Sequence, residues 1–119
     1  NVKFLPAIPY GGMSDLISNY HVGIALYKNN NINNYYCAPN KVYDYLMNGV
    51  PVVANDYPGL MKVLEGGKVG ACVAEVDLKN FRSALELICS ERRWENITDE
   101  VRNRYSWEAQ IPGFLAHFR

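Results

Sequence analysis

The pattern of hydrophobic and polar residues divides this chain into short apolar runs separated by amphipathic stretches. Apolar runs of four to six residues are typical of strands that are covered on both faces of a sheet. Three such runs predict strands at residues 22–27, 50–54 and 70–73, and a weak alternation at residues 2–5 predicts a fourth, short strand. Because helical stretches alternate with these runs, we expect an α/β fold with parallel strands, crossover helices and a partial doubly wound sheet.

Capping residues and glycines predict where the helices begin and end. Ser14, Asp77 and Ser106 can each accept a hydrogen bond from the first turn of a helix. The predicted helices cover residues 14–20, 39–48, 58–65, 92–104 and 107–118, and another begins at residue 78 and includes Ile88. In the helix after Asp77, helical spacing predicts an inward stripe of Leu78, Phe81, Leu85 and Ile88. Residues 28–38 are rich in asparagine, and we expect them to form a long loop.

The helix predicted at residues 39–48 has clear signals at both ends. Pro39 suits the first helical position, where its missing N–H costs nothing, and Asn40 suits the cap beside it. Gly49 suits the left-handed residue that ends a helix. The apolar run that follows predicts a buried strand, so the helix leads directly into the sheet.

This helix carries two different stripes. The apolar stripe consists of Val42, Tyr45, Leu46 and Gly49, and the polar stripe consists of Lys41, Asp44 and Asn48. In α/β proteins, a polar stripe beside a free helix N-terminus after a strand is a common place for a nucleotide. Lys41 and Asp44 are also three residues apart, so an ordinary surface ion pair on the helix is the alternative interpretation.

The segment PNKVYDYLMNGVPVVA resembles the donor-site segment of family-4-type glycosyltransferases of the GT-B fold. Members of that family read approximately Pro-Asn-Lys-aliphatic-aromatic-Glu-Tyr-Leu, followed by Gly-x-Pro-Val-Val. The matching positions are Pro39, Asn40, Lys41, Asp44, Tyr45, Leu46, Gly49, Pro51, Val52 and Val53. The order of the flanking elements also fits, so the resemblance covers nearly all of the chain. It implies a three-layer, Rossmann-like sheet in which residues 1–119 are one domain, part of the C-terminal lobe of a larger enzyme.

The resemblance also implies a site for a nucleotide-sugar donor. The free N–H groups at the helix start, residues 38–42 with Pro39, Asn40 and Lys41 among them, are the candidate position for the diphosphate. Asp44 occupies the position where relatives use Glu to bind the ribose. The turn of Ile8, Pro9 and Tyr10 corresponds to the place of the base. Tyr36 stands where many relatives carry a second Glu, eight residues before Asp44. The catalytic residues are not identified from this chain.

Composition limits the classes of function. The chain has 12 basic and 12 acidic residues, a balance that argues against a nucleic-acid partner held by counterion release. No Asp-x-Asp pair occurs, and the histidines lack a metal-ligand partner three or four residues away, so we expect no metal cofactor. Three widely spaced cysteines predict reduced thiols and a cytoplasmic protein. No apolar run is long enough to span a membrane.

The implied activity is transfer of a sugar from a nucleotide diphosphate to an acceptor hydroxyl. Acceptors in this family are often lipid-linked glycans or growing polysaccharides, so the full-length enzyme would act in the cytoplasm or at the inner face of the membrane. Two alternatives stay open. One is a nucleotide-sugar epimerase of the same architecture, and the other is a non-catalytic α/β interaction module, which would expose an apolar patch instead of a polar cleft.

Overall fold

The central feature of the fold is an open, parallel, three-stranded sheet. The structure, a computed structural model, describes residues 2–118. The strands are β1 (Gly23–Ala25), β2 (Val52–Asn55) and β3 (Gly70–Val73), and they lie in the order β1-β2-β3. Gly23 pairs with Val52, and Val52 pairs with Gly70. The prediction of parallel strands in an α/β fold is confirmed.

The predicted fourth strand, at residues 2–5, is wrong. These residues have no strand hydrogen bonds, and their side chains are exposed. A strand is stable only beside a partner, and β1 is paired with β2 alone within residues 2–118. The amide and carbonyl groups on the other edge of β1 are therefore open in the described part of the chain.

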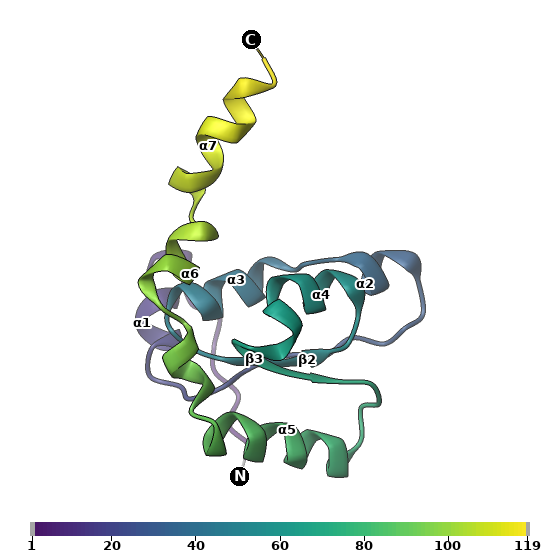
Figure 1. Cartoon of the computed structure of the whole chain (residues 1–119). Coiled ribbons are helices and arrows are strands. Elements are labelled where there is room, and N and C mark those ends of the chain that lie inside the picture. Colours follow the sequence, from purple (N-terminus) through teal and green to yellow (C-terminus); the bar gives the residue numbers. More distant parts are fainter. Residues whose placement is uncertain (1, 119) are drawn as a thin grey trace.

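Helices cover both faces of the sheet, which gives three layers (Figure 1). On one face lie α3 (Asn40–Met47) and α4 (Pro58–Val63), and α5 (Leu78–Ser90) lies on the other. Alternation along β2 separates two cores, because Val52 and Ala54 face α3 and α4 while Val53 faces α5. The larger core is closed by fully buried leucines of the helices, Leu46, Leu60 and Leu64.

The ends of α3 explain how the sequence forms this helix. Pro39 is the N-cap rather than the first helical residue, and Asn40 is the first residue of the helix rather than its cap. The helix stops where Gly49 adopts a φ of 73°, as predicted for a left-handed end. Val42 and Leu46 are fully buried, so the predicted apolar stripe does face the core.

Several shorter elements differ from the predictions. The N-terminal helix α1 is Met13–Ile17, it follows a 3-10 turn at Tyr10–Gly12, and Gly12 rather than Ser14 is its N-cap. The asparagine-rich segment contains the short helix α2 (Ile32–Tyr36), capped by the Asn31 side chain, so it is not a continuous loop.

The two serine- and aspartate-capped helices of the C-terminal half are confirmed. Asp77 accepts a hydrogen bond from the Asn80 amide at the start of α5, and Ser106 accepts one from the Ala109 amide at the start of α7 (Trp107–Ala116). In α5, however, Leu78 is 80 % exposed, and Ala84 joins Ile88 in the core in its place. Leu78 is the first residue of the helix, about one turn before Phe81, which is itself only partly buried.

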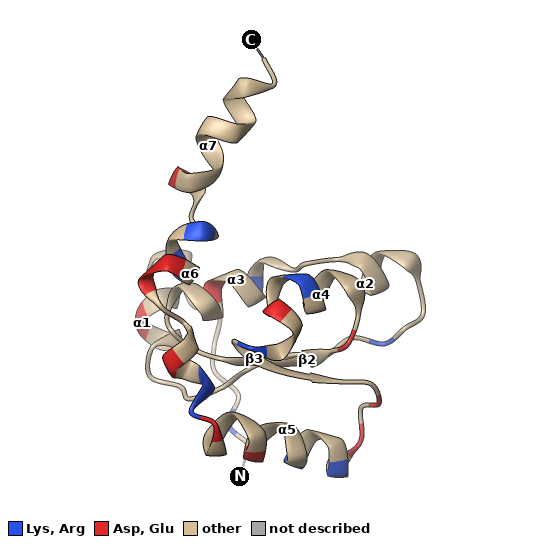
Figure 2. Ribbon diagram, viewed as in Figure 1, with Lys and Arg blue, Asp and Glu red and all other residues tan. Residues whose placement is uncertain are grey.

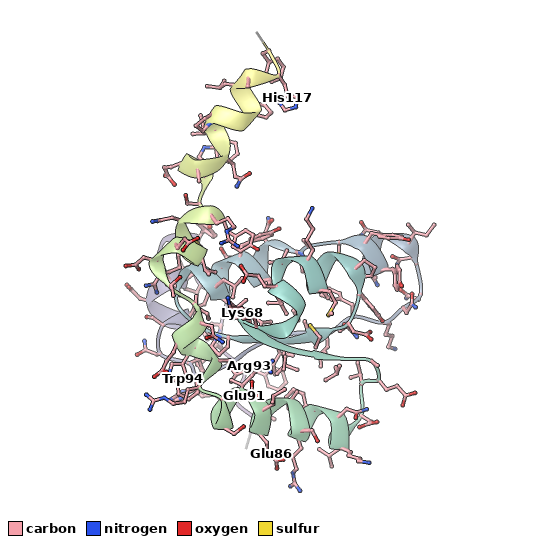
Figure 3. The ribbon with its side chains drawn as sticks, viewed as in Figure 1. Lys68, Glu86, Glu91, Arg93, Trp94 and His117 are labelled. Atoms are coloured by element: carbon pink, nitrogen blue, oxygen red, sulfur yellow. The ribbon has the colours of Figure 1, made fainter. Side chains whose placement is uncertain are left out.

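The single helix predicted at residues 92–104 is interrupted. Arg92 has a left-handed φ of 49°, a 3-10 turn follows at Arg93–Asn96, and α6 (Asp99–Arg104) starts afresh with Thr98 as its cap. Arg93 stabilises the turn, because its Nη1 donates to the carbonyls of Gly67 and Gly70 at 2.5 and 2.7 Å and its Nη2 lies 2.8 Å from Glu91 (Figure 3).

Helix α7 extends away from the sheet (Figure 1). None of its residues is buried, and Trp107, Phe114 and Leu115 are 66, 56 and 48 % exposed. The molecule is consequently elongated, with extents of 50 × 31 × 30 Å. Within residues 2–118, no helix combines the length and the apolar character needed to cross a membrane.

Candidate functional site

The N-terminus of α3 offers two unpaired backbone donors. The Val42 amide donates to the Pro39 carbonyl at 3.0 Å, whereas the amides of Asn40 and Lys41 donate to no group within residues 2–118. Pro39 makes no side-chain cap, so nothing from this residue covers the two amides. Together with the positive end of the helix macrodipole, these amides form a potential anion-binding position.

Lys41 lies beside this position and is held by an aromatic ring. Its ammonium nitrogen is 4.7 Å from the centre of the Tyr27 ring, in the segment that follows β1. The ion pairs of the described residues do not include one between Lys41 and Asp44. The simple surface pair on the helix is therefore not formed, and both charged groups are available to a ligand.

A cavity of about 390 Å³ brings three of the predicted site residues together. Tyr10, Lys41 and Asp44 all line it, although Tyr10 is more than thirty positions away in the chain. Tyr10 is 79 % exposed, so its ring is free to receive a planar group. The Asp44 carboxylate is half-buried, one helical turn after the two unpaired amides.

Sequence reasoning missed the apolar wall of this cavity. The wall is made by residues of α1 and the turn after it, together with the edge strand β1: Met13, Leu16, Ile17, Tyr20, Val22 and Ile24. Ile24 is 46 % exposed, and within the described residues no strand lies beside that edge of β1. The sequence predicted a helix at residues 14–20, but it did not predict which elements its apolar residues would face.

Hydrogen bonds tie α1 to α3 behind the cavity. Ser14, expected as a helix cap, instead donates from Oγ to the side-chain oxygen of Asn48. Asn48 in turn donates from Nδ2 to the Asp44 carbonyl at 2.8 Å. Ser14, Asp44 and Asn48 also line a smaller adjoining cavity of about 220 Å³. The polar stripe predicted on α3 therefore positions the helix as well as offering groups to a ligand.

The remaining predicted residues lie apart from the cavity lining. Ile8 and Pro9 lead into the 3-10 turn, where Gly12 donates to the Pro9 carbonyl at 2.9 Å. Tyr36 is at the end of α2, is 63 % exposed, and lines a different hollow with the asparagines that precede α2. The structure thus joins Tyr10 with Lys41 and Asp44 but does not place Tyr36 in the same cavity.

Charged residues are sparse along the chain before α3, and α2 carries none (Figure 2). Lys41 and Asp44 lie on α3, and residues 29–40 just before Lys41 contain no charged side chain. Among the described residues, no group of three or more histidine, cysteine, aspartate or glutamate side chains is arranged to hold a metal ion. The site therefore combines two free amides, one cation and one carboxylate with aromatic rings and an apolar wall.

The comparisons with known proteins do not identify the site. No protein-family model, no curated protein and no solved structure matches this chain.

Proposed function

We propose that this chain supplies part of the donor site of a GT-B glycosyltransferase. In this proposal, residues 1–119 belong to the C-terminal, nucleotide-sugar-binding lobe. The observation that carries it is that Tyr10, Lys41 and Asp44 line one cavity beside the two unpaired amides of α3. These are three of the groups that the resemblance to family-4-type glycosyltransferases assigns to the base, diphosphate and ribose.

The diphosphate is assigned to the start of α3. The amides of Asn40 and Lys41 donate to phosphate oxygens, and the Lys41 ammonium adds a positive charge. The helix macrodipole contributes about 0.3–1 kcal/mol per charge at an exposed helix end. These groups stabilise the negative charge that grows on the leaving diphosphate as the bond to the sugar breaks, which is an electrostatic contribution to catalysis.

The nucleoside is assigned to Asp44 and Tyr10. A carboxylate can accept hydrogen bonds from both ribose hydroxyls, and such charge-assisted bonds are stronger than neutral ones. Asp44 has one methylene fewer than the glutamate of the resembling family, so the ribose must approach α3 more closely here. The exposed ring of Tyr10 provides a stacking surface for the base, an interaction worth about 1–3 kcal/mol.

The acceptor and the catalytic residues are assigned to the other lobe of the two-lobed enzyme. We expect the isolated chain to bind a nucleoside diphosphate in the millimolar range, since only part of the site is present, and to transfer no sugar. Apolar residues on the cavity wall next to the open edge of β1, such as Ile24, would be covered in the complete lobe.

A ligand-observed NMR titration of the chain with UDP, GDP and ADP tests the proposal. We expect one nucleotide to bind, and we expect the Asp44→Ala variant to lose saturation transfer to the ribose protons. Asp99→Ala is the matched control, because Asp99 is 87 % exposed on α6 and lines none of the cavities described above. Absence of binding at 10 mM nucleotide, or binding that ignores the Asp44 substitution, would contradict the proposal.

A further inference from the structure

A second cavity, of about 450 Å³, lies at the carboxyl ends of the three strands. It is lined by the segment after β1 (residues 26–29), by Asn55 and Tyr57 at the end of β2, and by Ala74 and Val76 after β3. It shares no lining residue with the 390 Å³ cavity. This edge of a parallel sheet is where open α/β folds bind ligands, and the volume lies in the range of about 300–1,000 Å³ of small-molecule pockets.

Asn55 directs an unused hydrogen-bond donor into this cavity. The residue is 1 % exposed, and its Oδ1 accepts the Tyr27 amide at 2.6 Å, which leaves Nδ2 as the free end of the side chain. Nδ2 donates to no group within residues 2–118. In the described chain, every buried side-chain nitrogen or oxygen that solvent cannot reach has a hydrogen-bond partner, so an unpaired Nδ2 must be reachable by solvent. Nδ2 therefore opens to the cavity that Asn55 lines. A buried amide with an open donor requires an acceptor oxygen from a ligand or from water.

Hydrogen bonds tie two walls of the cavity together. Besides the bond from its amide to Asn55, Tyr27 accepts a hydrogen bond at its carbonyl from the Tyr57 hydroxyl, at 3.1 Å. Tyr57 is itself buried, with 7 % of its surface exposed. Both backbone polar groups of Tyr27 are thus held by side chains from the end of β2. This part of the cavity is preorganised, which reduces the entropy that a ligand must overcome on binding.

The chemistry of the lining fits an uncharged ligand that has one apolar face and a polar rim. Tyrosine rings and aliphatic side chains alternate with the amides of Asn29 and Asn55. Among the described lining residues, Lys28 alone carries a charge, and residues 29–40 add none. A pyranose ring has the matching character, because it presents an apolar C–H face and a rim of hydroxyl oxygens. A phosphate or nucleotide would need more cations or free helix amides than this cavity provides.

From these observations we propose that the cavity binds a single neutral hexopyranose unit, separately from the nucleotide. The apolar face of the sugar packs on Leu26, Ala74 and Val76, and one of its hydroxyl oxygens accepts the hydrogen bond from Asn55 Nδ2. Lys28 and Asn29 lie at the more exposed side, where the remaining hydroxyls meet solvent. This inference does not depend on the proposed donor site.

Saturation-transfer NMR with the methyl glycosides of glucose, galactose and mannose tests the proposal. We expect transfer to at least one of them, with the signal retained in saturating UDP and in Asp44→Ala. Asn55→Asp keeps an acceptor for the Tyr27 amide and removes the donor, so affinity should fall about tenfold. Asn103→Asp, an exposed position on α6, introduces the same charge away from the cavity and should bind as the wild type does.

A second variant keeps the proposal testable if Asn55→Asp does not fold. Ala74 is exposed and lines the cavity, so Ala74→Phe fills the space without disturbing the core, and it should abolish the transfer. Circular dichroism checks that each variant is folded. The proposal is overturned by absence of transfer from all three glycosides, by transfer that persists in the folded Ala74→Phe variant, or by transfer that UDP abolishes.

Discussion

The ammonium of Lys41 lies 4.7 Å from the centre of the Tyr27 ring. This contact joins the first turn of α3 to the segment after β1. It also lies between the two cavities to which ligands are assigned, because Lys41 lines one and Tyr27 lines the other. Lys41 therefore has two roles: its contact with Tyr27 stabilises this edge of the sheet, and its charge belongs to the proposed nucleotide site.

Lys41→Ala should weaken both properties. Loss of an exposed cation–π contact should lower the free energy of unfolding by about 0.5–1 kcal/mol, measured by urea denaturation. Loss of the cation at the α3 N-terminus should also reduce nucleotide affinity. Lys62→Ala on α4 is the control, because Lys62 is exposed and lines neither cavity. Equal effects of the two substitutions on nucleotide binding would argue against a role for Lys41.

Gly70→Ala should be strongly destabilising. A Cβ at Gly70 would lie 2.2 Å from the carbonyl oxygen of Val52, and this backbone atom belongs to the paired strand β2. The strands would have to separate, so we expect a loss of at least about 1–3 kcal/mol in the free energy of unfolding.

Gly113→Ala is the matched substitution for this prediction. A Cβ at Gly113 meets no atom within 4 Å, and the residue lies inside α7. The exchange should leave stability unchanged or raise it by up to about 1 kcal/mol, because alanine favours a helix over glycine. Similar unfolding midpoints for the two variants in thermal denaturation would be inconsistent with the close strand contact.

Leu46→Ala tests the packing of α3 on the sheet. Leu46 is fully buried in the core that contains Val52 and Ala54. Truncating a leucine at such a site typically costs about 2–5 kcal/mol of stability. Met47→Ala, one position along the same helix, should cost much less, because Met47 is 40 % exposed. The difference between the two free energies of unfolding, measured in urea, checks that α3 packs in this orientation.

The pH dependence of stability should report the environment of Cys72 on β3. Burial raises the pKa of its thiol from 9.0 to about 11, the Asp56 carboxylate adds to the increase, and Arg93 opposes it. The folded chain therefore keeps this proton when the unfolded chain has lost it. The free energy of unfolding should fall as the pH rises from about 9 to 11, and this thiol should cause no change with pH below about pH 8.

The contribution of Cys72 can be isolated by difference. Unfolding curves of the wild type and of Cys72→Ala, recorded from pH 8 to pH 10.5, should converge as the pH rises. Cys89→Ala, at an exposed cysteine on α5, is the control for the loss of a thiol elsewhere in the chain. A constant difference between wild type and Cys72→Ala over the whole range would contradict the raised pKa.

The central elements of the fold could be predicted because their signals are local. The apolar run at Val52, the glycine stop at Gly49 and the caps Asp77 and Ser106 all depend on neighbours in the sequence, and the structure has each of them. The strand at residues 2–5 was predicted from the same kind of signal and is wrong. A strand depends on a partner, which no local pattern reveals.

The candidate site could be predicted only in part. The polar stripe on α3 identified Lys41 and Asp44 as neighbours on one surface, and they do line one cavity. The contact of Lys41 with Tyr27 and the bond from Ser14 to Asn48 join residues that are far apart in the chain. Asn55 gave no signal in the sequence, because its exceptional feature is an unpaired donor in a buried side chain, which only the folded structure reveals.

Amide chemical-shift mapping of the ¹⁵N-labelled chain with UDP, GDP and ADP tests the central claim most directly. The donor-site proposal predicts that one nucleotide shifts the amides of Asn40, Lys41 and Tyr10 together and leaves those of α6 and α7 unchanged. Shifts confined to other parts of the chain, or no shifts at 10 mM of any of the three nucleotides, would contradict it.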